Sequence, residues 1–223
     1  MSGGGPRSPE PVRVAVVDYG AGNLVSIRQA LTAVGADVAI VTAPEELTRA
    51  DLLVVPGVGA AAPAMARLDA QGLVEPIRAW VRADRPFLGI CLGLQLLFEG
   101  SDEDGAQTLG LLPGRTVRLD GAPTLPHIGW NQVVRTRAHE AFGGIPDGAD
   151  LYFVHSFVGR PAGGSEELVV AETTHGAPFA SVVGRGRLLG VQFHPERSGR
   201  HGLRLLSNVI AAARTPSPVG SVA

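Results

Sequence analysis

This sequence has only one cysteine, little net charge and no long apolar run. Its 223 residues include a single cysteine, so no internal disulfide can form, which suits a reducing compartment. A formal net charge of −2 gives no reason to expect nucleic acid or an acidic membrane surface as a partner. No apolar run approaches the ~20 residues of a membrane span, and the N-terminus has no hydrophobic signal core. These absences predict a soluble chain that acts in the cytoplasm.

The residue spacing of a metal site is also missing. One cysteine and scattered histidines do not give the spacing of a metal site, and the acidic cluster at residues 102–104 is by default a solvated loop. Neither a metal nor a cofactor is therefore predicted.

The composition favours one folded domain between two tails. Hydrophobic residues make up 45% of the chain, which is ample for a buried core. Residues 1–11 and 214–223 carry Gly, Pro and Ser without a helical pattern, which is typical of flexible tails. No repeat and no linker divides the interior. We therefore expect a single domain over residues 12–213.

Strand and helix patterns alternate in the first half of the chain, and the second half is richer in strands. The predicted strands are Val12–Val17, Val38–Val41, Leu52–Val55, Phe87–Ile90, Thr116–Leu119, Asn131–Val134, Leu151–Val158, Leu168–Thr173, Phe179–Val183 and Leu188–Phe193. Helices are predicted after an Asn23 cap, after a Thr42/Glu45 capping box, around Met65, and over Glu75–Arg82, Leu92–Glu99 and Gly202–Ala213. Continuous apolar strands between helices indicate an α/β, doubly wound fold: a mostly parallel sheet covered on both faces, with an added β-rich portion.

The single cysteine has the surroundings of a nucleophile. Cys91 lies where an apolar strand changes abruptly to a helical pattern, and Gly89 and Gly93 stand two residues away on each side. This small-x-nucleophile-x-small spacing is typical of a nucleophile elbow, whose sharp turn leaves no room for neighbouring side chains. A helix N-terminus there favours thiolate over thiol. The alternative is a buried core cysteine, a common fate of this residue type.

A thiolate nucleophile needs a proton partner, and His194 is the best candidate among six histidines. It ends an apolar strand, and Pro195 biases it toward extended backbone. Residues i and i+2 on extended chain share a face, so Glu196 can orient the imidazole. The pattern predicts a Cys–His–Glu arrangement. The histidines expected in loops or near helix starts, with structural roles, are His127, His139, His175 and His201.

Attack on a carbonyl also needs donors for the developing oxyanion. The Gly57–Val58–Gly59 segment follows a predicted strand, at the edge where open α/β sheets place their sites. Its glycines allow backbone N–H groups to approach a ligand, and no Gly-Lys-Ser/Thr follows to make it a phosphate loop.

With these motifs in place, the sequence resembles the class I (triad-type) glutamine amidotransferases, and among them the glutaminase subunits of imidazole glycerol phosphate synthase, from histidine biosynthesis. The similarity runs from about Val12 to Ala213. The stretches that support the narrower resemblance are Asp18–Asn23, Pro56–Gly59, Pro126–Asn131 and Tyr152–Ser156.

The resemblance implies a role for each matching residue. Cys91 would be the nucleophile that forms a γ-glutamyl thioester, His194 the general base and acid, and Glu196 its orienting carboxylate. The oxyanion would be held by the N–H of Leu92 and by one from Gly57, Val58 or Gly59, in a strand that must rearrange. The residues implied to bind L-glutamine are Gln95, Glu103, His155, Ser156 and Phe157.

The resemblance also implies a partner. Ammonia would pass to a separate (β/α)8-barrel synthase (cyclase) subunit in a heterodimer, and there react with a phosphorylated ribulosyl nucleotide to give imidazole glycerol phosphate and an aminoimidazole-carboxamide ribotide. Residues implied to face this partner are Tyr19, Asn23, Trp130, Asn131 and Arg197. Family members commonly have Tyr where this chain has Phe157 and Lys where it has Arg197, so a side-chain hydrogen bond and an interface contact are in question.

Three other functions are compatible with parts of the pattern. The first is another glutaminase of this class, such as the small subunit of anthranilate synthase or of pyridoxal phosphate synthase. The second is a free-standing thiol hydrolase of γ-glutamyl compounds, which would act without a partner. The third is a catalytically silent binding subunit, which the intact triad disfavours.

Overall fold

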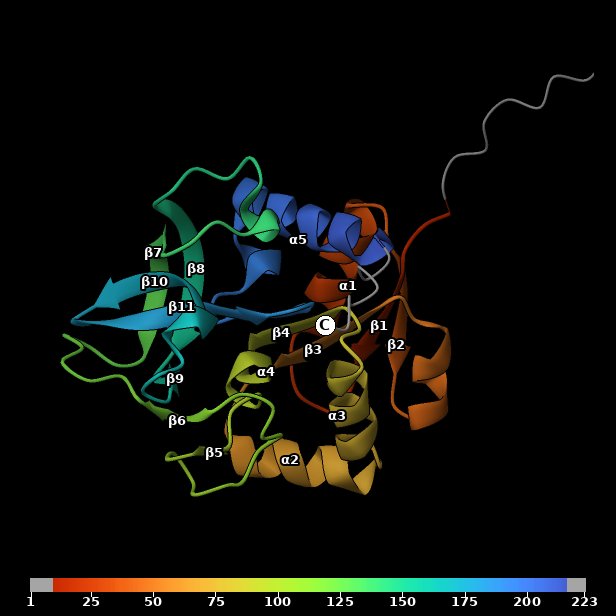
Figure 1. Cartoon of the computed structure of the whole chain (residues 1–223), viewed down its shortest axis with the longest axis horizontal. Helices are drawn as coiled ribbons and strands as arrows, with labels where there is room; N and C mark the ends of the chain where they lie inside the picture. Colours follow the sequence, from red (N-terminus) through yellow and green to blue (C-terminus); the bar gives the residue numbers. More distant parts are fainter. Residues whose placement is uncertain (1–9, 216–223) are drawn as a thin grey trace, which may run out of the picture.

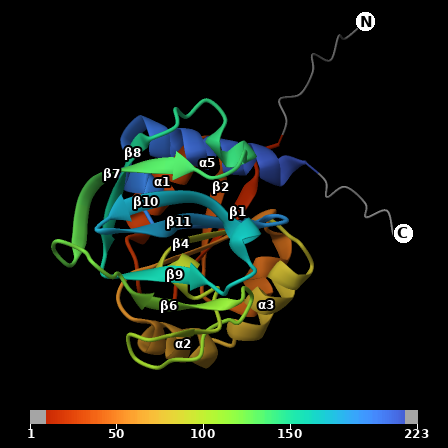
Figure 2. The same cartoon turned by 60° about the vertical axis from the view of Figure 1, so that its left-hand side comes forward.

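The computed structural model describes residues 10–215, and in this part of the chain a nine-stranded sheet runs through the middle with helices on both faces (Figure 1). The strand order is β2–β1–β3–β4–β12–β11–β10–β7–β8. The first five of these strands are parallel and the other four run antiparallel to their neighbours. A smaller sheet, β5–β6–β9, lies beside the antiparallel half (Figure 2). The predicted fold class is confirmed.

The element bounds follow the sequence pattern closely. The strands are β1 (Arg13–Val17), β2 (Asp37–Val41), β3 (Leu52–Gly57), β4 (Phe87–Cys91), β5 (Gly100–Ser101), β6 (Gly114–Arg118), β7 (His127–Arg135), β8 (Ala149–His155), β9 (Phe157–Pro161), β10 (Val169–His175), β11 (Ala177–Arg185) and β12 (Leu188–Val191). The α-helices are α1 (Leu24–Ala33), α2 (Ala61–Ala70), α3 (Val74–Arg82), α4 (Leu92–Gln95) and α5 (Gly199–Arg214). The 3-10 helices are η1 (Pro44–Arg49), η2 (Glu140–Phe142), η3 (Glu166–Leu168) and η4 (Pro195–Arg197).

Alternate residues of the parallel strands feed two separate cores, because side chains of a strand point to opposite faces. Val14 and Val16 pack with α1 and α5 on one face, and Ala15 and Val17 pack with α2 and α3 on the other. Figure 1 shows these two helix pairs above and below the sheet. Both faces are buried, so the strands must be apolar throughout, which is why they read as continuous hydrophobic runs.

The parallel strands end together at one edge of the sheet. The strand order changes direction between β1 and β3, which makes this edge the topological switch point at which open α/β sheets bind ligands. Residues from the segments after β1, β3 and β12 line one hollow beside Ile90 of β4, and Val58 and Gly59 after β3 also line the cavity of Cys91. The fold therefore gathers four sequence-distant segments at one place.

The strand predicted over Leu151–Val158 is wrong as a single element. The chain leaves the large sheet after β8 and enters the small sheet with β9, and Ser156 between them accepts the N–H of Leu119 with its carbonyl (3.0 Å). Apolar and aromatic residues stand on both sides of His155 and Ser156, so the sequence pattern carries no sign of the change of sheet.

The helix predicted over Leu92–Glu99 is also too long, because α4 ends at Gln95. Backbone N–H groups of residues 109–112 bond to the carbonyls of Leu96, Leu97 and Phe98. The N–H of Glu99 likewise donates to the Gly114 carbonyl (3.1 Å) and not to Gln95, so the last predicted turn is held by other segments and is not helical.

The capping box predicted at Thr42 and Glu45 is shifted by one residue. Glu46 accepts the backbone N–H groups of Thr42 (2.7 Å) and Ala43 (2.9 Å), and η1 starts at Pro44. The Asn23 cap is confirmed, since its Oδ1 accepts the N–H of Ser26 at 3.3 Å.

The predicted tails fall largely on residues 1–9 and 216–223, which lie outside the described residues. Of the rest, residue 214, assigned to the C-terminal tail in the prediction, belongs to α5. Among residues 10–215, no helix is both long and apolar enough to cross a membrane.

Candidate active site

Cys91 lies at a sharp strand-to-helix turn. It ends β4 and precedes α4 with φ 54° and ψ −109°, a strained conformation for a residue with a side chain. A Cβ on Gly89 would lie 2.6 Å from the Gly93 carbonyl oxygen, and a Cβ on Gly93 would overlap the Val55 carbonyl of β3. Both glycines are therefore required by close backbone approach, as the elbow pattern predicts.

His194 and Glu196 are paired beside this turn. Nδ1 of His194 lies 2.9 Å from Oε1 of Glu196, and the two side chains are 7% and 1% exposed. The pairing does not come from extended chain as expected. Extended backbone stops at His194, and Pro195 opens the 3-10 helix η4, which turns Glu196 back toward the ring.

The surroundings of His194 favour its charged form. Burial by itself lowers the pKa of His194, but Cys91 and Glu196 outweigh burial and raise it. Within the described chain, Nε2 of His194 is buried without a hydrogen-bond partner. An imidazolium next to a sulfur is the arrangement that a thiolate nucleophile requires.

Cys91 opens into a cavity of about 470 Å³. Its lining includes all five residues expected to bind glutamine, and Val58 and Gly59 of the expected oxyanion segment, together with Ala60, Pro126 and Val154. A cavity of this size holds a small metabolite. The structure thus brings together the nucleophile and the expected binding residues from β4, α4, the β5–β6 loop and the β8–β9 junction.

Polar groups in this cavity are held in place by the protein. Gln95 donates Nε2–H to the Phe157 carbonyl at 2.8 Å. This acceptor is a backbone oxygen, so the bond does not depend on whether residue 157 is Phe or Tyr. Burial, and then the charge of Asp104, raise the pKa of Glu103, whose carboxylate suits an amino group. The default prediction that Glu103 lies in a solvated loop is thus only partly right, because Glu103 is exposed and also lines the cavity.

The Gly57–Val58–Gly59 segment lies next to the elbow. Gly57 pairs with Cys91 across β3 and β4, and Gly59 has a φ of 88°. A Cβ on Gly57 would lie 2.9 Å from the Leu92 side chain and would overlap the Tyr19 hydroxyl. Close backbone approach at Gly57 therefore places this segment beside the start of α4.

Tyr19, expected among the residues that face a partner, has its side chain buried within this chain. It is 1% exposed, its ring packs in the core, and its hydroxyl donates to the Pro56 carbonyl at 2.8 Å. Burial raises the pKa of Tyr19. Tyr19 therefore supports the end of β3 from within the core. The residues around Tyr19 have the sequence pattern of a loop, which does not reveal this role.

The other residues expected at an interface are accessible. Trp130 is 55% exposed and Asn23 and Arg197 are exposed, whereas Asn131 is half-buried. The Arg197 guanidinium lies 4.2 Å over the Tyr152 ring, and that ring meets Trp130 edge-on at 6.0 Å. Exposed Ile128 continues this apolar surface along β7. An aromatic, arginine-containing surface is typical of an interface core.

Two residues of the site were missed by sequence reasoning. Gln192 is fully buried and its Nε2 lies 3.5 Å from the Cys91 sulfur. Its place directly after β12 and two residues before His194 was an available signal. His127, expected in a loop, lies in β7 and is hydrogen-bonded to His155 at 3.0 Å. That pairing depends on strand register, so no local pattern could reveal it.

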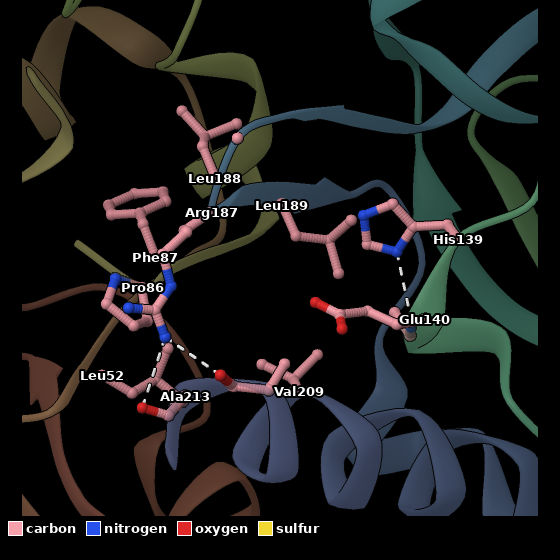
Figure 3. Close-up of a pocket in the computed structure, with 13 residues that line it drawn as sticks. Leu52, Pro86, Phe87, His139, Glu140, Arg187, Leu188, Leu189, Val209 and Ala213 are labelled. Carbon is pink, nitrogen blue, oxygen red and sulfur yellow. Dashed lines mark hydrogen bonds between the residues drawn. The ribbon is translucent and has the colours of Figure 1, made fainter. Parts of the chain in front are cut away.

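A second hollow lies at the opposite ends of β3, β4 and β12 (Figure 3). It holds only about 40 Å³, room for a few waters. Arg187 there donates to the Ala212 carbonyl (2.9 Å) at the end of α5, which is a capping contact. Among the described residues, no group of three or more His, Cys, Asp or Glu side chains is arranged to hold a metal ion.

Comparison with known proteins gives consistent matches. The family model for class I glutamine amidotransferases matches residues 15–213. Imidazole glycerol phosphate synthase subunit HisH of Moorella thermoacetica is 49% identical over 196 residues, 87% of this chain and 92% of that protein. The HisH subunit of Chloroflexus aurantiacus is 45% identical over 212 residues, 93% of this chain and 99% of that protein.

Solved structures with the same fold are more distant in sequence. A crystal structure described as a glutamine amidotransferase has a TM-score of 0.72 at 21% identity and covers 91% of this chain and 99% of its own. PurLQS from Thermotoga maritima has a TM-score of 0.70 at 19% identity, with the same coverage of both chains. At these identities the likeness concerns the fold.

Proposed function

Because this chain belongs to the class I glutamine amidotransferases, and within them to the HisH subunits of imidazole glycerol phosphate synthase, we propose that it hydrolyses glutamine at Cys91 and supplies ammonia to a synthase partner in histidine biosynthesis. The observation that carries the proposal is the cavity in which Cys91 meets Gln95, Glu103 and the β8–β9 junction. The reaction is conversion of glutamine and water to glutamate and ammonia.

Covalent chemistry begins at the Cys91 sulfur. The thiolate attacks the side-chain carbonyl carbon of glutamine, and His194, charged beside Glu196, gives its proton to the departing ammonia. A γ-glutamyl thioester remains on the sulfur. Water then attacks this thioester while neutral His194 takes the water proton, and glutamate leaves as the thiolate reforms. Glu196 holds the ring through Nδ1 during both steps.

The oxyanion formed in each step needs backbone donors. Leu92 opens α4 directly after Cys91, so its N–H has no acceptor within the helix and is available to the oxyanion. A second donor comes from the Gly57–Val58–Gly59 segment beside it. Glycine at two of its three positions gives this segment the freedom to turn a peptide group.

The partner is a separate (β/α)8-barrel subunit, joined to this chain as a heterodimer, which uses the ammonia to make imidazole glycerol phosphate and aminoimidazole-carboxamide ribotide. Trp130, Tyr152 and Arg197 form an exposed aromatic surface that suits its docking. We place the complex in the cytoplasm, where the only cysteine of the chain stays reduced.

Glutamate release should be slow for this chain alone and rise about 10²-fold or more with the partner and its nucleotide ligand. An increase of this size is the rate effect expected from one added oxyanion donor. The assay compares glutamate formation by the chain alone, with the partner, and with partner plus nucleotide. Equal and rapid rates in all three would contradict the partner-gated reaction and identify a free-standing hydrolase. Absence of glutamate in all three would contradict glutaminase activity itself.

A further inference from the structure

The carbonyl oxygen of Phe157 receives two N–H donors in the wall of the glutamine cavity. Gln95 Nε2 lies 2.8 Å from it and His155 Nδ1 lies 3.1 Å from it. A carbonyl oxygen only accepts hydrogen bonds, so Gln95 must present its amide nitrogen and His155 must carry a proton on Nδ1. This one oxygen therefore fixes the orientation of one amide and the tautomer of one ring.

The hydrogen bonds continue outward from His155 along β7. Nε2 of His155 lies 3.0 Å from Nδ1 of His127. Since a neutral His155 has its proton on Nδ1, its Nε2 accepts, and Nδ1 of His127 must donate. Nε2 of His127 then accepts from the Asn131 amide nitrogen at 3.2 Å. That amide is oriented independently, because its nitrogen donates to the Thr174 carbonyl and its oxygen accepts the N–H of Gln132.

Hydrogen bonds also continue from the Phe157 oxygen inward to the nucleophile. Gln95 Nε2 also donates to Oε1 of Gln192 at 3.2 Å, which leaves Nε2 of Gln192 facing the Cys91 sulfur at 3.5 Å. Gln192 is fully buried, so its amide has few alternative partners. A continuous set of hydrogen bonds thus joins half-buried Asn131 to Cys91: donors from Asn131 through His155 end on the Phe157 oxygen, and Gln95 donates both to that oxygen and onward to Gln192.

Both rings are held in their neutral forms. His127 and His155 are 3% and 6% exposed. Burial, and then the charge of His175, lower the pKa of His127 to about 4. Burial, and then the charge of His127, lower the pKa of His155 to about 3, with smaller effects of His175 and His194 in the same direction. His175 stacks on His127 at 4.0 Å and bonds to the Thr124 carbonyl, so it adds no hydrogen bond to the path.

We propose that Asn131, His127 and His155 form a hydrogen-bond relay of fixed direction that holds the Phe157 carbonyl, and through it Gln95 and Gln192, in place for reaction at Cys91. His127 and His155 are positioning residues in this relay, which rests on the proposed glutaminase function. Asn131 adjoins exposed Trp130, so the relay joins the surface assigned to the partner with the glutamine cavity.

The protonation pattern can be observed without any assay of activity. In the full chain labelled with ¹⁵N-histidine, long-range ¹H–¹⁵N NMR reports which ring nitrogen carries the proton. Both His127 and His155 should show a proton on Nδ1 and none on Nε2 from about pH 5 to about pH 8, where ordinary histidines titrate. A proton on Nε2 of either ring, or titration of either near pH 6.5, would overturn the relay while leaving the glutaminase proposal standing.

A matched pair of variants separates hydrogen bonding from packing. His127→Asn keeps an N–H close to the position of Nδ1, whereas His127→Leu fills the apolar space between Phe153 and Phe179 without a donor. In the complete synthase, kcat/KM for glutamine should fall about tenfold or more with leucine, and asparagine should restore most of the loss. Ammonia-dependent synthesis should stay unchanged in both variants.

His201→Leu, on α5 and outside the relay, serves as the control and should keep the parent kcat/KM. Equal kcat/KM for His127→Asn and His127→Leu, or a better leucine variant, would assign His127 a packing role and contradict the relay. If the leucine variant does not fold, the NMR measurement on the unaltered chain still decides.

Discussion

Replacing Cys91 with alanine is expected to reduce glutamine-dependent synthesis at least about 10⁴-fold, as loss of a triad nucleophile does in other enzymes. The chain contains no second thiol that could take over the attack. Ammonia supplied from solution bypasses Cys91, so ammonia-dependent synthesis by the same complex should remain close to the parent rate. The two rates, measured on one preparation, separate loss of chemistry from loss of the complex.

The alanine variant should fold, because Cβ and the strained φ of residue 91 are unchanged. Its main structural cost is at Gln192, whose amide loses its sulfur partner, about 1–2 kcal/mol for a buried donor left unsatisfied. Glutamine-dependent synthesis above about 1% of the parent rate would show that another group performs the attack. Loss of ammonia-dependent synthesis would point instead to a damaged complex.

Gly93→Ala should destabilise the fold by at least about 3 kcal/mol, the upper range for forcing extra atoms into a packed site. Helix propensity predicts the opposite sign, since alanine is favoured over glycine by about 1 kcal/mol inside a helix. At Gly93, however, a Cβ would overlap the Val55 carbonyl of β3, and backbone cannot move aside as a flexible side chain does. Urea unfolding at fixed pH measures the free energy difference.

Gly163→Ala is the matched control, because Gly163 has open space around its Cα and no positive φ. Its free energy of unfolding should stay within about 0.5 kcal/mol of the parent. A Gly93→Ala variant as stable as the control would show that α4 is not pressed against β3, and the elbow geometry would be wrong.

Glycine spacing could be predicted because its cause is local. The turn at Cys91 excludes side chains two residues away on either side, so the sequence itself records the constraint. The parallel sheet could be predicted equally well, because burial of both faces makes each strand continuously apolar. In these cases a physical requirement acts on residues that are neighbours along the chain.

The His127–His155 pair could not be predicted, because its cause is register. β7 and β8 place these two residues opposite each other, although 28 positions separate them in sequence. Each histidine alone looks structural. The burial of Tyr19 was hidden for a similar reason, since the Pro56 carbonyl that its hydroxyl bonds lies 37 residues away. The burial and pairing of such side chains depend on partners that are distant in the sequence, and a single sequence does not identify those partners.

The proposed reaction requires that the Cys91 sulfur is the atom that attacks glutamine. The most direct measurement treats the complete synthase with a diazoketone analogue of glutamine and locates the modification by mass spectrometry of peptides. We expect one adduct per chain on the peptide that contains Cys91, protection by excess glutamine, and loss of glutamine-dependent but not ammonia-dependent synthesis. Inactivation with Cys91 unmodified, or an adduct on another residue, would contradict the proposed reaction.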